Sequence, residues 1–563
     1  MTRRNTPANA PTPSGSSSRS GKTRTLGTTS RGWVAFVGSG PGDPGLLTVR
    51  AVELLREAEV VVTEVPGHEE LLRTVLGPER LAGEDAPTLI DGGFGEDGQP
   101  LTHAARAKVV VREAKKGKRL VRLMAGDPFL YASGPEEAQA CVKAGLGLEI
   151  VPGISSVNAV PAYAGIPLTS KDNRAVAVVS CREKVDWSHH IDTPTLVLLS
   201  AVGSIGETAK ALIDAGRSPE TPVAVTRVGT TTDQQTLVTS LAHVAADVRA
   251  AKIAPPAVVV VGDVVGMRDA LSWFETKPLF GWRVLVPRTK EQAGSLSSGL
   301  RGFGAVPEEV PTISVEPPRN PLQMDKAVRG LVEGRYEWIA FTSVNAVKAV
   351  REKFEEYGLD ARAFSGLKIA AVGDKTAAAI AAWGLRADLV PDGEQSAAGL
   401  LEVWPEFDEV LDPINRVFLP RADIATETLV AGLIDLGWEC DDVTAYRTVR
   451  ATPPPAPVRD AIKSGKFDAV VFTSSSTVRN LVGIAGKPHP STVIAVIGPA
   501  TAKTAEEHGL RVDVMASQPD VDVLVDALAE FGAARRLAMI EAGEPVTKPS
   551  ERKPAARRRV SSK

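Results

Sequence analysis

Residues 34–48 read VAFVGSGPGDPGLLT, and this stretch decides the interpretation of the first half of the chain. A β-branched apolar run ends in a loop of glycine, proline and aspartate. The segment TVRAVELLREA at 48–58 then shows helical periodicity. A strand, a tight turn and a helix in this order are typical of an α/β layer. The question is whether the loop holds a phosphate group or serves another purpose.

The loop does not fit the known phosphate-binding patterns. In a G-x-G-x-x-G dinucleotide loop, Gly38 and Gly40 would be the first two glycines, but the third place is Asp43, whose carboxylate would repel a pyrophosphate. Pro41 removes one backbone N–H, and phosphate loops bind through such donors. No Lys-Ser or Lys-Thr pair follows. These residues disfavour a nucleotide-dependent oxidoreductase, and a purely structural turn is the alternative for this loop alone.

Seven more short apolar runs follow in the first half, with amphipathic stretches between them. They lie at 60–63, 120–126, 148–153, 175–180, 195–200, 222–229 and 257–262. Runs without polar alternation indicate strands that are covered on both faces. The predicted fold class is therefore α/β, with subdomains at about 32–169 and 170–275 of a domain spanning 32–275. The segment SWFETKPLFGW at 272–282, with a linker at 276–282, separates the two halves.

Size and composition indicate a soluble protein of several domains. The 563 residues predict about four domains of ordinary size. A net charge of -3 argues against general nucleic-acid binding, and no apolar run is long enough to cross a membrane. The three cysteines are far apart, which predicts neither a disulfide nor a metal site and fits a reducing compartment, so we expect a cytoplasmic protein. Residues 1–31 and 531–563 are expected to be disordered and basic.

The second half of the chain contains an internal duplication. Three segments (VLVPR, FTSVNAV and the longer AAVGDKTAAAIAAWGLRADLVP) return in similar form and in the same order. The pairs are 284–288 with 417–421, 341–347 with 472–478, and 370–391 with 495–516. Such a repeat predicts two similar α/β lobes, and the cleft between two lobes is a common ligand site.

Two later loops carry patterns related to the opening loop. RLMAGDPFLY at 122–131 contains a second Gly-Asp-Pro turn, and VPGISSVNAVPAYAGIPLT at 151–169 contains a third loop of small residues. Together with GSGPGDPGLLT, they resemble the tetrapyrrole methylase family, and within it the uroporphyrinogen-III C-methyltransferases, over about residues 33–275. The resemblance implies S-adenosyl-L-methionine as methyl donor and a homodimer through this domain. A sulfonium donor suits loops with carboxylates and few N–H groups.

The resemblance also implies which residues hold the methyl donor. These are small or backbone-presenting residues at strand ends: Pro41, Ala125, Gly126, Asp127, Leu130, Ser155, Ser156 and Gly229. Glu64 stands where the family has an aspartate thought to move a proton, so it is the catalytic candidate. The loop AGDPFLYASG lacks a family arginine, and Ser200 replaces a methionine. The alternative is therefore a weakened or inactive methylase domain that stabilises its fused neighbour.

The second half resembles the uroporphyrinogen-III synthase family. The motifs are VLVPRT, WIAFTSVNAV, VGDKTA, LPRADIATETL, VTAYRTV, FDAVVFTSSSTVRNL and VIGPATA. The resemblance implies a two-lobed domain at 283–530, with lobe one at 283–314 plus 447–530 and lobe two at 315–446. The implied substrate is hydroxymethylbilane, which such enzymes close with inversion of ring D. Tyr446 would donate a proton to the departing hydroxyl, since a phenol stays protonated at neutral pH. A tyrosine that only packs at the hinge is the alternative.

A substrate with eight carboxylates needs hydrogen-bond donors, and hydroxyl-rich turns at helix N-termini supply them. The candidates are Arg288, Thr342, Ser343, Arg421, Thr473, Ser474, Ser475 and Thr501. Each also has a structural explanation, since Ser or Thr after a strand is commonly an N-cap and the arginines could be solvated.

Taken together, the two resemblances predict a bifunctional enzyme. The second half would make uroporphyrinogen III, and the first half would methylate it toward precorrin-2, a precursor of sirohaem or cobalamin. The partners are small-molecule substrates, without nucleic acid, membrane or metal. A two-lobed tetrapyrrole-binding regulator is the alternative from another class, and the lack of a helix-turn-helix or secretion signal speaks against it.

Overall fold

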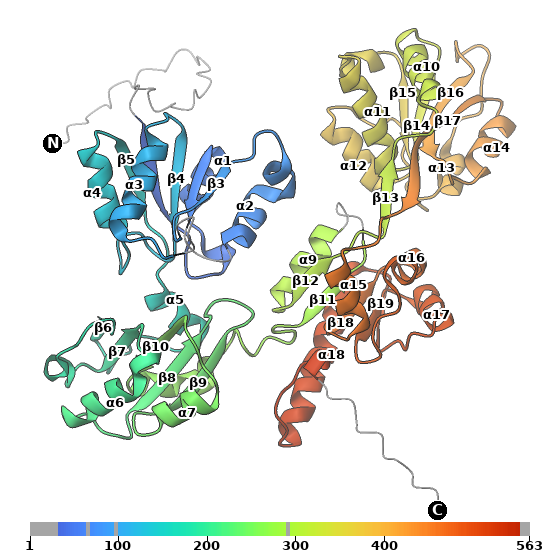
Figure 1. Cartoon of the computed structure of the whole chain (residues 1–563). Coiled ribbons are helices and arrows are strands. Elements are labelled where there is room, and N and C mark those ends of the chain that lie inside the picture. Colours follow the sequence, from blue (N-terminus) through green and yellow to red (C-terminus); the bar gives the residue numbers. More distant parts are fainter. Residues whose placement is uncertain (1–31, 64–67, 95–98, 289–292, 552–563) are drawn as a thin grey trace, which may run out of the picture. The chain divides into compact units, whose positions relative to one another are not determined.

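The computed structural model describes residues 32–63, 68–94, 99–288 and 293–551 (Figure 1). The chain divides into two compact units, unit 1 ending at Thr276 and unit 2 beginning at Lys277. The boundary therefore falls inside the segment that was predicted to separate the halves. Residues on either side of the boundary pack into their own unit, because Phe274 is buried in unit 1 and Leu279 and Trp282 are buried in unit 2.

The first sheet of unit 1 is parallel throughout, in the order β3-β2-β4-β1-β5. Its strands are β1 (Trp33–Gly38), β2 (Val60–Thr63), β3 (Thr88–Asp91), β4 (Arg119–Met124) and β5 (Gly147–Val151). One face packs on α1 (Val49–Glu57) and α2 (His68–Ala82), and the other on α3 (His103–Ala114) and α4 (Gly134–Lys143). Burial on both faces explains why these strands carry little polar alternation.

The second sheet of unit 1 is mixed, in the order β6-β7-β10-β8-β9. Its strands are β6 (Val176–Ser180), β7 (Thr195–Leu199), β8 (Pro222–Arg227), β9 (Gln235–Ser240) and β10 (Ala257–Val261). Helices α6 (Ile205–Asp214) and α7 (Val244–Ala250) cover one face. Helix α5 (Ser156–Tyr163), which follows the first sheet in the chain, packs on the opposite face through Val157 and Val160. The short α8 (Arg268–Leu271) follows β10.

Lobe one of unit 2 is a parallel sheet in the order β12-β11-β18-β19-β20. Its strands are β11 (Arg283–Val286), β12 (Val306–Glu309), β18 (Ala469–Phe472), β19 (Val493–Val496) and β20 (Val514–Met515). Helices α9 (Ala293–Gly302) and α18 (Val521–Glu541) pack on one face. The other face is covered by α15 (Ala456–Lys463), α16 (Ser475–Ala485) and α17 (Pro499–Glu507).

Lobe two of unit 2 has the order β13-β17-β16-β14-β15, in which only the edge strand β13 is antiparallel to its neighbour. Its strands are β13 (Ile313–Glu316), β14 (Trp338–Phe341), β15 (Lys368–Ala371), β16 (Arg416–Ala422) and β17 (Glu439–Arg450). One face packs on α10 (Pro321–Val332), α11 (Val344–Glu356) and α12 (Asp374–Ala382). The other packs on α13 (Ala397–Val403) and α14 (Thr428–Asp435).

The repeated segments occupy equivalent places in the two sheets of unit 2. The run β11-β18-β19 in one sheet corresponds to β16-β14-β15 in the other, so each duplicated motif gives the same strand position. The chain leaves the first sheet after β12, enters the second at β13 and returns along β17. The two connections lie side by side, because Ile313 pairs with Arg450 in an antiparallel register. The α/β fold class predicted from the sequence is confirmed.

The predicted disordered tail from residue 531 is wrong for residues 531–551. Helix α18 continues to Glu541, because the segment is rich in alanine and leucine and its start is capped by Asp520. Beyond the helix, the Ser550 backbone N–H donates to Asp468 Oδ1 at 2.9 Å, and Lys548 Nζ donates to the Gly281 carbonyl at 3.2 Å. These contacts fix the end of the described chain on lobe one. The predicted arm at 1–31 and residues 552–563 lie outside the described residues.

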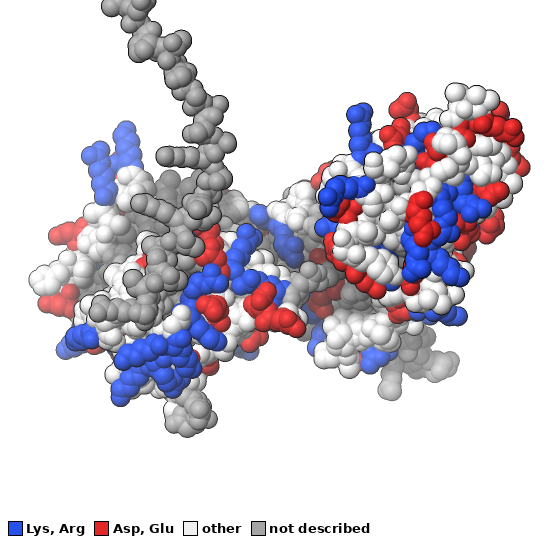
Figure 2. Space-filling view, turned by 90° about the horizontal axis from the view of Figure 1, so that it is seen from above, with Lys and Arg blue, Asp and Glu red and all other residues white. Residues whose placement is uncertain are grey.

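On the face shown in Figure 2, acidic and basic side chains are interspersed over unit 2, in keeping with the chain's net charge of -3. In the described part of the chain, no helix is long and apolar enough to span a membrane. The same residues contain no cluster of three or more His, Cys, Asp or Glu side chains arranged to hold a metal ion.

Candidate functional site

Three loops of unit 1 meet at the carboxyl ends of β1, β4 and β5. Gly40 and Gly126 form a two-bond backbone bridge, with N–O distances of 3.3 and 2.8 Å. Gly153 approaches from the third loop, and a Cβ there would lie 2.1 Å from the Gly126 carbonyl oxygen. A Cβ on Gly38 would lie 2.5 Å from the Gly153 Cα atom. Because the obstacles are backbone atoms, only glycine permits this three-way contact.

Asp127 holds two of these loops together through its side chain. Its Oδ1 accepts from the Phe129 backbone N–H at 2.7 Å, and its Oδ2 accepts from the Gly153 backbone N–H at 3.1 Å. The carboxylate therefore faces the protein's own backbone. Neighbouring Gly126 has a left-handed φ of +64°, which turns the chain sharply at the end of β4.

A fourth loop comes from the second sheet and contacts the opening loop. Thr230 Oγ1 accepts from the Asp43 backbone N–H at 3.2 Å, and Tyr163 Oη donates to Asp43 Oδ2 at 2.8 Å. Gly229 packs against α5 so closely that a Cβ would lie 2.5 Å from a methyl of Val160. Asp43, which the sequence suggested would repel a phosphate, therefore binds α5 through its carboxylate and the loop after β8 through its backbone N–H.

We name residues 38–43, 125–127, 153–156 and 228–231 the four glycine loops. Together they bring most of the predicted donor-binding residues to one place: Pro41, Ala125, Gly126, Asp127, Ser155, Ser156 and Gly229. Ser155 is the N-cap of α5, and its Oγ accepts from the Val157 N–H at 3.2 Å. Leu130 follows on the surface beside the second loop and is exposed. Glu64, the predicted catalytic carboxylate, lies outside the described residues.

The four glycine loops fit a cationic ligand better than a polyanionic one. They contain no lysine or arginine, and their two aspartates are satisfied by N–H and O–H donors. The N-terminus of α5 adds backbone N–H groups, which favour a single carboxylate at that end. The backbone N–H groups at the start of α5 and the absence of basic side chains in the loops are both consistent with a zwitterionic sulfonium ligand.

Behind the loops lies a buried polar group that sequence reasoning missed. His68, at the start of α2, is 5% exposed, and its Nε2 lies 2.9 Å from Ser39 Oγ, while its Nδ1 contacts Thr63 Oγ1. Burial, with a smaller contribution from the charge of Arg122, lowers the pKa of His68 to about 4. The imidazole is therefore neutral at physiological pH and joins the ends of β1 and β2.

Arg122 forms a buried ion pair with Glu137, and the sequence contained a signal for it but did not identify the partner. Arg122 is fully buried in β4, and its Nε and Nη2 donate to the Glu137 carboxylate at 2.7 and 3.1 Å. Ser133 Oγ donates to the same carboxylate at 2.7 Å. An arginine inside the apolar run LVRLM was the available signal, because a buried guanidinium requires a paired acid. The pair fixes β4 against α4 immediately before the second glycine loop.

In unit 2 the structure brings the predicted acid, Tyr446, against a predicted donor, Ser343. Their hydroxyl oxygens lie 2.9 Å apart, with Tyr446 on β17 and Ser343 at the N-terminus of α11. Ser343 also caps α11 by accepting from the Ala346 N–H at 3.1 Å. The serine is thus an N-cap and a partner of the tyrosine at once.

Tyr446 lines a cavity of about 480 Å³ between β13 and α11. The proline-rich connection around β13 forms one wall. Polar and charged side chains of α11 reach the other wall, and these are Asn345, Lys348, Glu352, Lys353 and Glu356. With Glu316 from β13, the charged lining comprises two lysines and three glutamates, and Lys353 is paired with Asp325 and Glu356. The cavity is large enough for an organic ligand, and its lining is mixed in charge.

Arg421 is buried inside lobe two. Its guanidinium contacts both Asp442 carboxylate oxygens and the Thr426 carbonyl, so it ties β16 to β17. The alternative of a solvated arginine therefore does not hold for Arg421. A role in binding substrate stays a prediction that would require Arg421 to leave these partners. Its repeat equivalent Arg288 is half-buried, and burial lowers the pKa of its guanidinium.

The remaining predicted hydroxyls lie on strand-end turns. Thr342 directly follows β14 and Thr473 directly follows β18, so each precedes its helix N-cap. Ser474 caps α16 and accepts from the Thr477 N–H at 3.3 Å. Ser475 Oγ donates to the Ala500 carbonyl at 3.0 Å, which joins this turn to that of the buried Thr501. The N-cap interpretation holds for both copies of the repeat.

Comparison with known proteins assigns both halves. The tetrapyrrole (corrin/porphyrin) methylase family matches residues 34–245, and the uroporphyrinogen-III synthase HemD family matches residues 294–526. The porphyrin biosynthesis protein HemD of Ruminiclostridium josui is 32% identical over 89% of this chain and 98% of its own length. An S-adenosyl-L-methionine-dependent uroporphyrinogen III methyltransferase of Methanosarcina barkeri is 39% identical over 43% of this chain and 94% of its own.

Among solved structures, the uroporphyrin-III C-methyl transferase of Thermus thermophilus, complexed with S-adenyl homocysteine, is 31% identical. It covers 42% of this chain and 93% of its own, with a TM-score of 0.35. The full-length similarity to the Ruminiclostridium protein spans both halves in the same order. The chain therefore belongs to the same family as this porphyrin biosynthesis protein HemD, and in this chain a tetrapyrrole methylase domain precedes a uroporphyrinogen-III synthase domain.

Proposed function

We propose that this chain catalyses two consecutive steps of tetrapyrrole synthesis. Unit 2 closes hydroxymethylbilane to uroporphyrinogen III with inversion of ring D, and unit 1 methylates that product twice toward precorrin-2. The observation that carries the proposal is the meeting of the four glycine loops, which are free of basic residues and require glycine where they touch. The family membership of both halves supports the pairing of the two reactions.

In unit 1 the methyl donor is S-adenosyl-L-methionine, which supplies an electrophilic methyl group on a sulfonium. The main chain of Ala125, Gly126 and Asp127 would line it. The α5 N-terminus at Ser155 and Ser156 would receive its carboxylate. Gly229 and Pro41 would complete the site on the side of the second sheet. The protein's own contribution is to align two reactants and to exclude water, without a covalent intermediate.

In unit 2 Tyr446 acts as the general acid. Its O–H bond breaks as the proton passes to the terminal hydroxyl of hydroxymethylbilane, and the C–O bond breaks to release water. Attack by a substituted pyrrole carbon on the resulting azafulvene cation gives a spiro intermediate, which fragments and recloses. The proton released when the closed macrocycle regains its aromatic pyrroles returns to the Tyr446 phenolate. Ser343 holds the phenol in place through the 2.9 Å contact. Lys348 and Asn345 face the same cavity and would meet substrate carboxylates.

A single product analysis tests both activities. The full-length protein is given hydroxymethylbilane with and without S-adenosyl-L-methionine, and the oxidised products are separated by isomer and mass. We expect the type III isomer in both samples and methylated species only with the donor. Only type I isomer, which forms spontaneously, would contradict the synthase. Type III without methylation would indicate an inactive methylase, and tetrapyrrole binding without turnover would indicate a regulator.

The methylase unit is also expected to form a homodimer. This expectation follows from the family resemblance alone, and light scattering on the purified chain measures it directly. A monomeric mass across a tenfold range of protein concentration would contradict it.

A further inference from the structure

The turn at Val228–Thr231 is held in an unfavourable backbone conformation. Val228 and Thr230 have φ values of +45° and +69°, in the left-handed region, where side chains branched at Cβ are rare. Such backbone persists only when the surroundings fix it. This turn contains Gly229, one of the proposed donor-binding residues. The groups that fix it therefore bear on the donor site.

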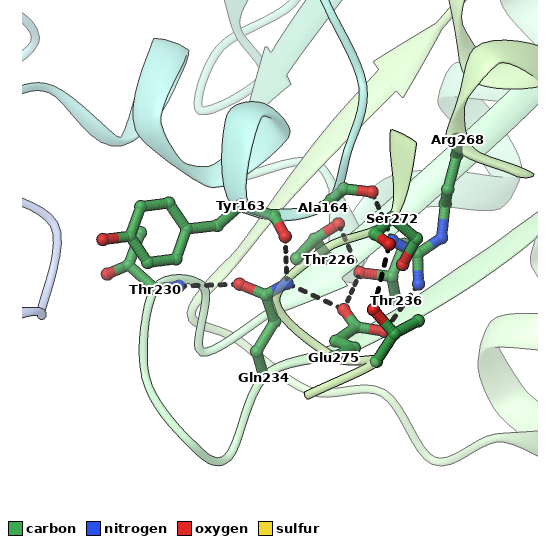
Figure 3. A network of polar contacts seen from close by, with 10 residues as sticks. Tyr163, Ala164, Thr226, Thr230, Gln234, Thr236, Arg268, Ser272 and Glu275 are labelled. Atoms are coloured by element: carbon green, nitrogen blue, oxygen red, sulfur yellow. Dashed lines mark hydrogen bonds and ion pairs between the residues drawn. The ribbon is translucent and has the colours of Figure 1, made fainter. Parts of the chain in front are cut away.

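Gln234 is one of the side chains that fix the turn (Figure 3), and Thr231 Oγ1 also donates to the Val228 carbonyl at 2.8 Å. Gln234 is 4% exposed, and its Oε1 accepts from the Thr230 backbone N–H at 2.8 Å. Its Nε2 donates to the Tyr163 carbonyl at 3.2 Å and to Glu275 Oε1 at 2.7 Å. Two acceptors on one side and one donor on the other allow a single orientation of the amide. The Oε1 atom is thus directed at Thr230.

Glu275 in turn fixes Gln234 from the segment that leads out of unit 1. Its Oε1 also accepts from Thr236 Oγ1 at 2.5 Å, and its Oε2 accepts from Arg268 Nη2 at 2.5 Å. Arg268 further donates to the Ala164 carbonyl at the end of α5. The carboxylate is 16% exposed and accepts from donors on Gln234, Thr236 and Arg268.

The network ends on the two residues that clasp the opening loop. Thr230 accepts from Asp43 N–H through Oγ1, and Tyr163 donates to the Asp43 carboxylate. The Tyr163 ring is also held by Trp273 and Phe274, with ring centroids 5.0 and 4.7 Å away. The segment around Glu275 therefore determines where both contacts to Asp43 are placed.

We propose that Gln234 and Glu275 are positioning residues for methyl-donor binding: they hold Thr230 and Tyr163 so that the fourth glycine loop closes on the first. This inference rests on the proposed function of unit 1. Neither residue lies in the loops themselves, and both act through Thr230 and Tyr163. Glu275 makes the exit segment of unit 1 part of the donor site.

The test compares Gln234→Leu and Glu275→Gln with matched variants at exposed neighbours, Gln235→Leu and Asp269→Asn. Calorimetric titration of each full-length protein with S-adenosylhomocysteine gives the Kd. We expect about a tenfold weaker Kd for each network variant, because each leaves a buried polar group unpaired, and about no change for the controls. KM for S-adenosyl-L-methionine should rise while KM for uroporphyrinogen III stays constant, a split that general unfolding would not produce.

The double variant Gln234→Leu with Glu275→Gln sharpens the test. Gln234 and Glu275 are bonded to each other and act through the same two residues, Thr230 and Tyr163, so the loss in the double variant should stay well below the sum of the single losses. Hydrogen exchange should rise at 228–236 and not in β1.

If a network variant unfolds unit 1, Thr236→Val removes a single donor to Glu275 and should weaken Kd by a smaller factor. Unchanged Kd in folded network variants, or additive losses, would overturn the proposal. A wild-type protein that does not bind S-adenosylhomocysteine would instead overturn the proposed function of unit 1.

Discussion

The strand-end turns of the two units form their contacts in different ways, through main chain in unit 1 and through side chains in unit 2. In unit 1 the four glycine loops touch one another through main chain, and their geometry depends on the absence of a Cβ at Gly38 and Gly153. In unit 2 the turns at Ser343 and Ser474 are separate helix caps with the same local structure, and Ser343 also meets Tyr446. A site built from backbone is sensitive to an added methyl group. A site built from side chains is sensitive to a lost hydroxyl.

The largest effect is expected where a methyl group meets backbone. In Gly153→Ala the new Cβ would lie 2.1 Å from the Gly126 carbonyl oxygen, which neither loop can avoid without moving. We expect loss of S-adenosylhomocysteine binding and methyl transfer, and destabilisation of unit 1 by about 3 kcal/mol or more. Gly203→Ala is the control, because its Cβ meets nothing within 4 Å. Calorimetric binding and thermal unfolding measure both, and equal behaviour of the two variants would contradict the backbone account.

The buried histidine behind the glycine loops predicts a pH dependence of unit 1. Its pKa is about 4 in the fold, against about 6.5 in an unfolded chain. The unfolded chain therefore takes up a proton between pH 6.5 and 4 that the folded unit does not. Stability falls as the pH decreases through this window, by up to about 2–3 kcal/mol. Calorimetry should show this slope in the wild type and a flatter one in His68→Gln, whereas the same slope in both would rule out His68 as its source.

The side-chain site of unit 2 is tested by removing one hydroxyl. Tyr446→Phe keeps the ring packing and removes the proposed proton donor, so we expect synthase kcat to fall by about 10–100-fold. Turnover should be slowed and not abolished, because the fold still positions the substrate. Quenched-flow measurement of type III formation gives the rate, and a full rate in Tyr446→Phe would exclude the acid role.

The two copies of the repeat offer a matched pair with the smallest effects. Ser343→Ala and Ser474→Ala each remove an N-cap, which costs about 1 kcal/mol of stability. Only the first also removes the contact to Tyr446, so it alone should lower synthase kcat, by several-fold. Ser474→Ala should affect KM instead, if its turn binds a substrate carboxylate. Denaturant unfolding and steady-state kinetics separate the two effects, and an equal fall in kcat would contradict the distinction.

Much of this architecture was accessible from the sequence. All eight strands predicted in unit 1 exist, because doubly covered strands leave a continuous apolar run. The missed strands, β3 and β9, lie at sheet edges, where half-exposed residues such as those of QTLVTS at 235–240 carry no such signal. The repeat correctly predicted two similar α/β lobes, and the structure adds that its repeated segments occupy equivalent strand positions.

The side-chain contacts were much less accessible. The partnership of His68 with Ser39 depends on how α2 returns over β1, which local sequence does not encode. Arg421 was predicted to bind substrate, with a solvated arginine as the alternative, and its buried pairing with Asp442 on the adjacent strand was not foreseen. Glu275 could not be linked to Gln234, because 40 residues separate them and only packing of the exit segment on α5 brings them together.

The most direct test of the account measures both reactions in two variants of the full-length chain. Gly153→Ala and Tyr446→Phe are each given hydroxymethylbilane, and separately uroporphyrinogen III with S-adenosyl-L-methionine. The account predicts a crossed result: Gly153→Ala forms type III isomer at the normal rate without methylation, and Tyr446→Phe methylates normally but forms type III slowly. Loss of both reactions in either folded variant, or of neither, would contradict two independent sites on one chain.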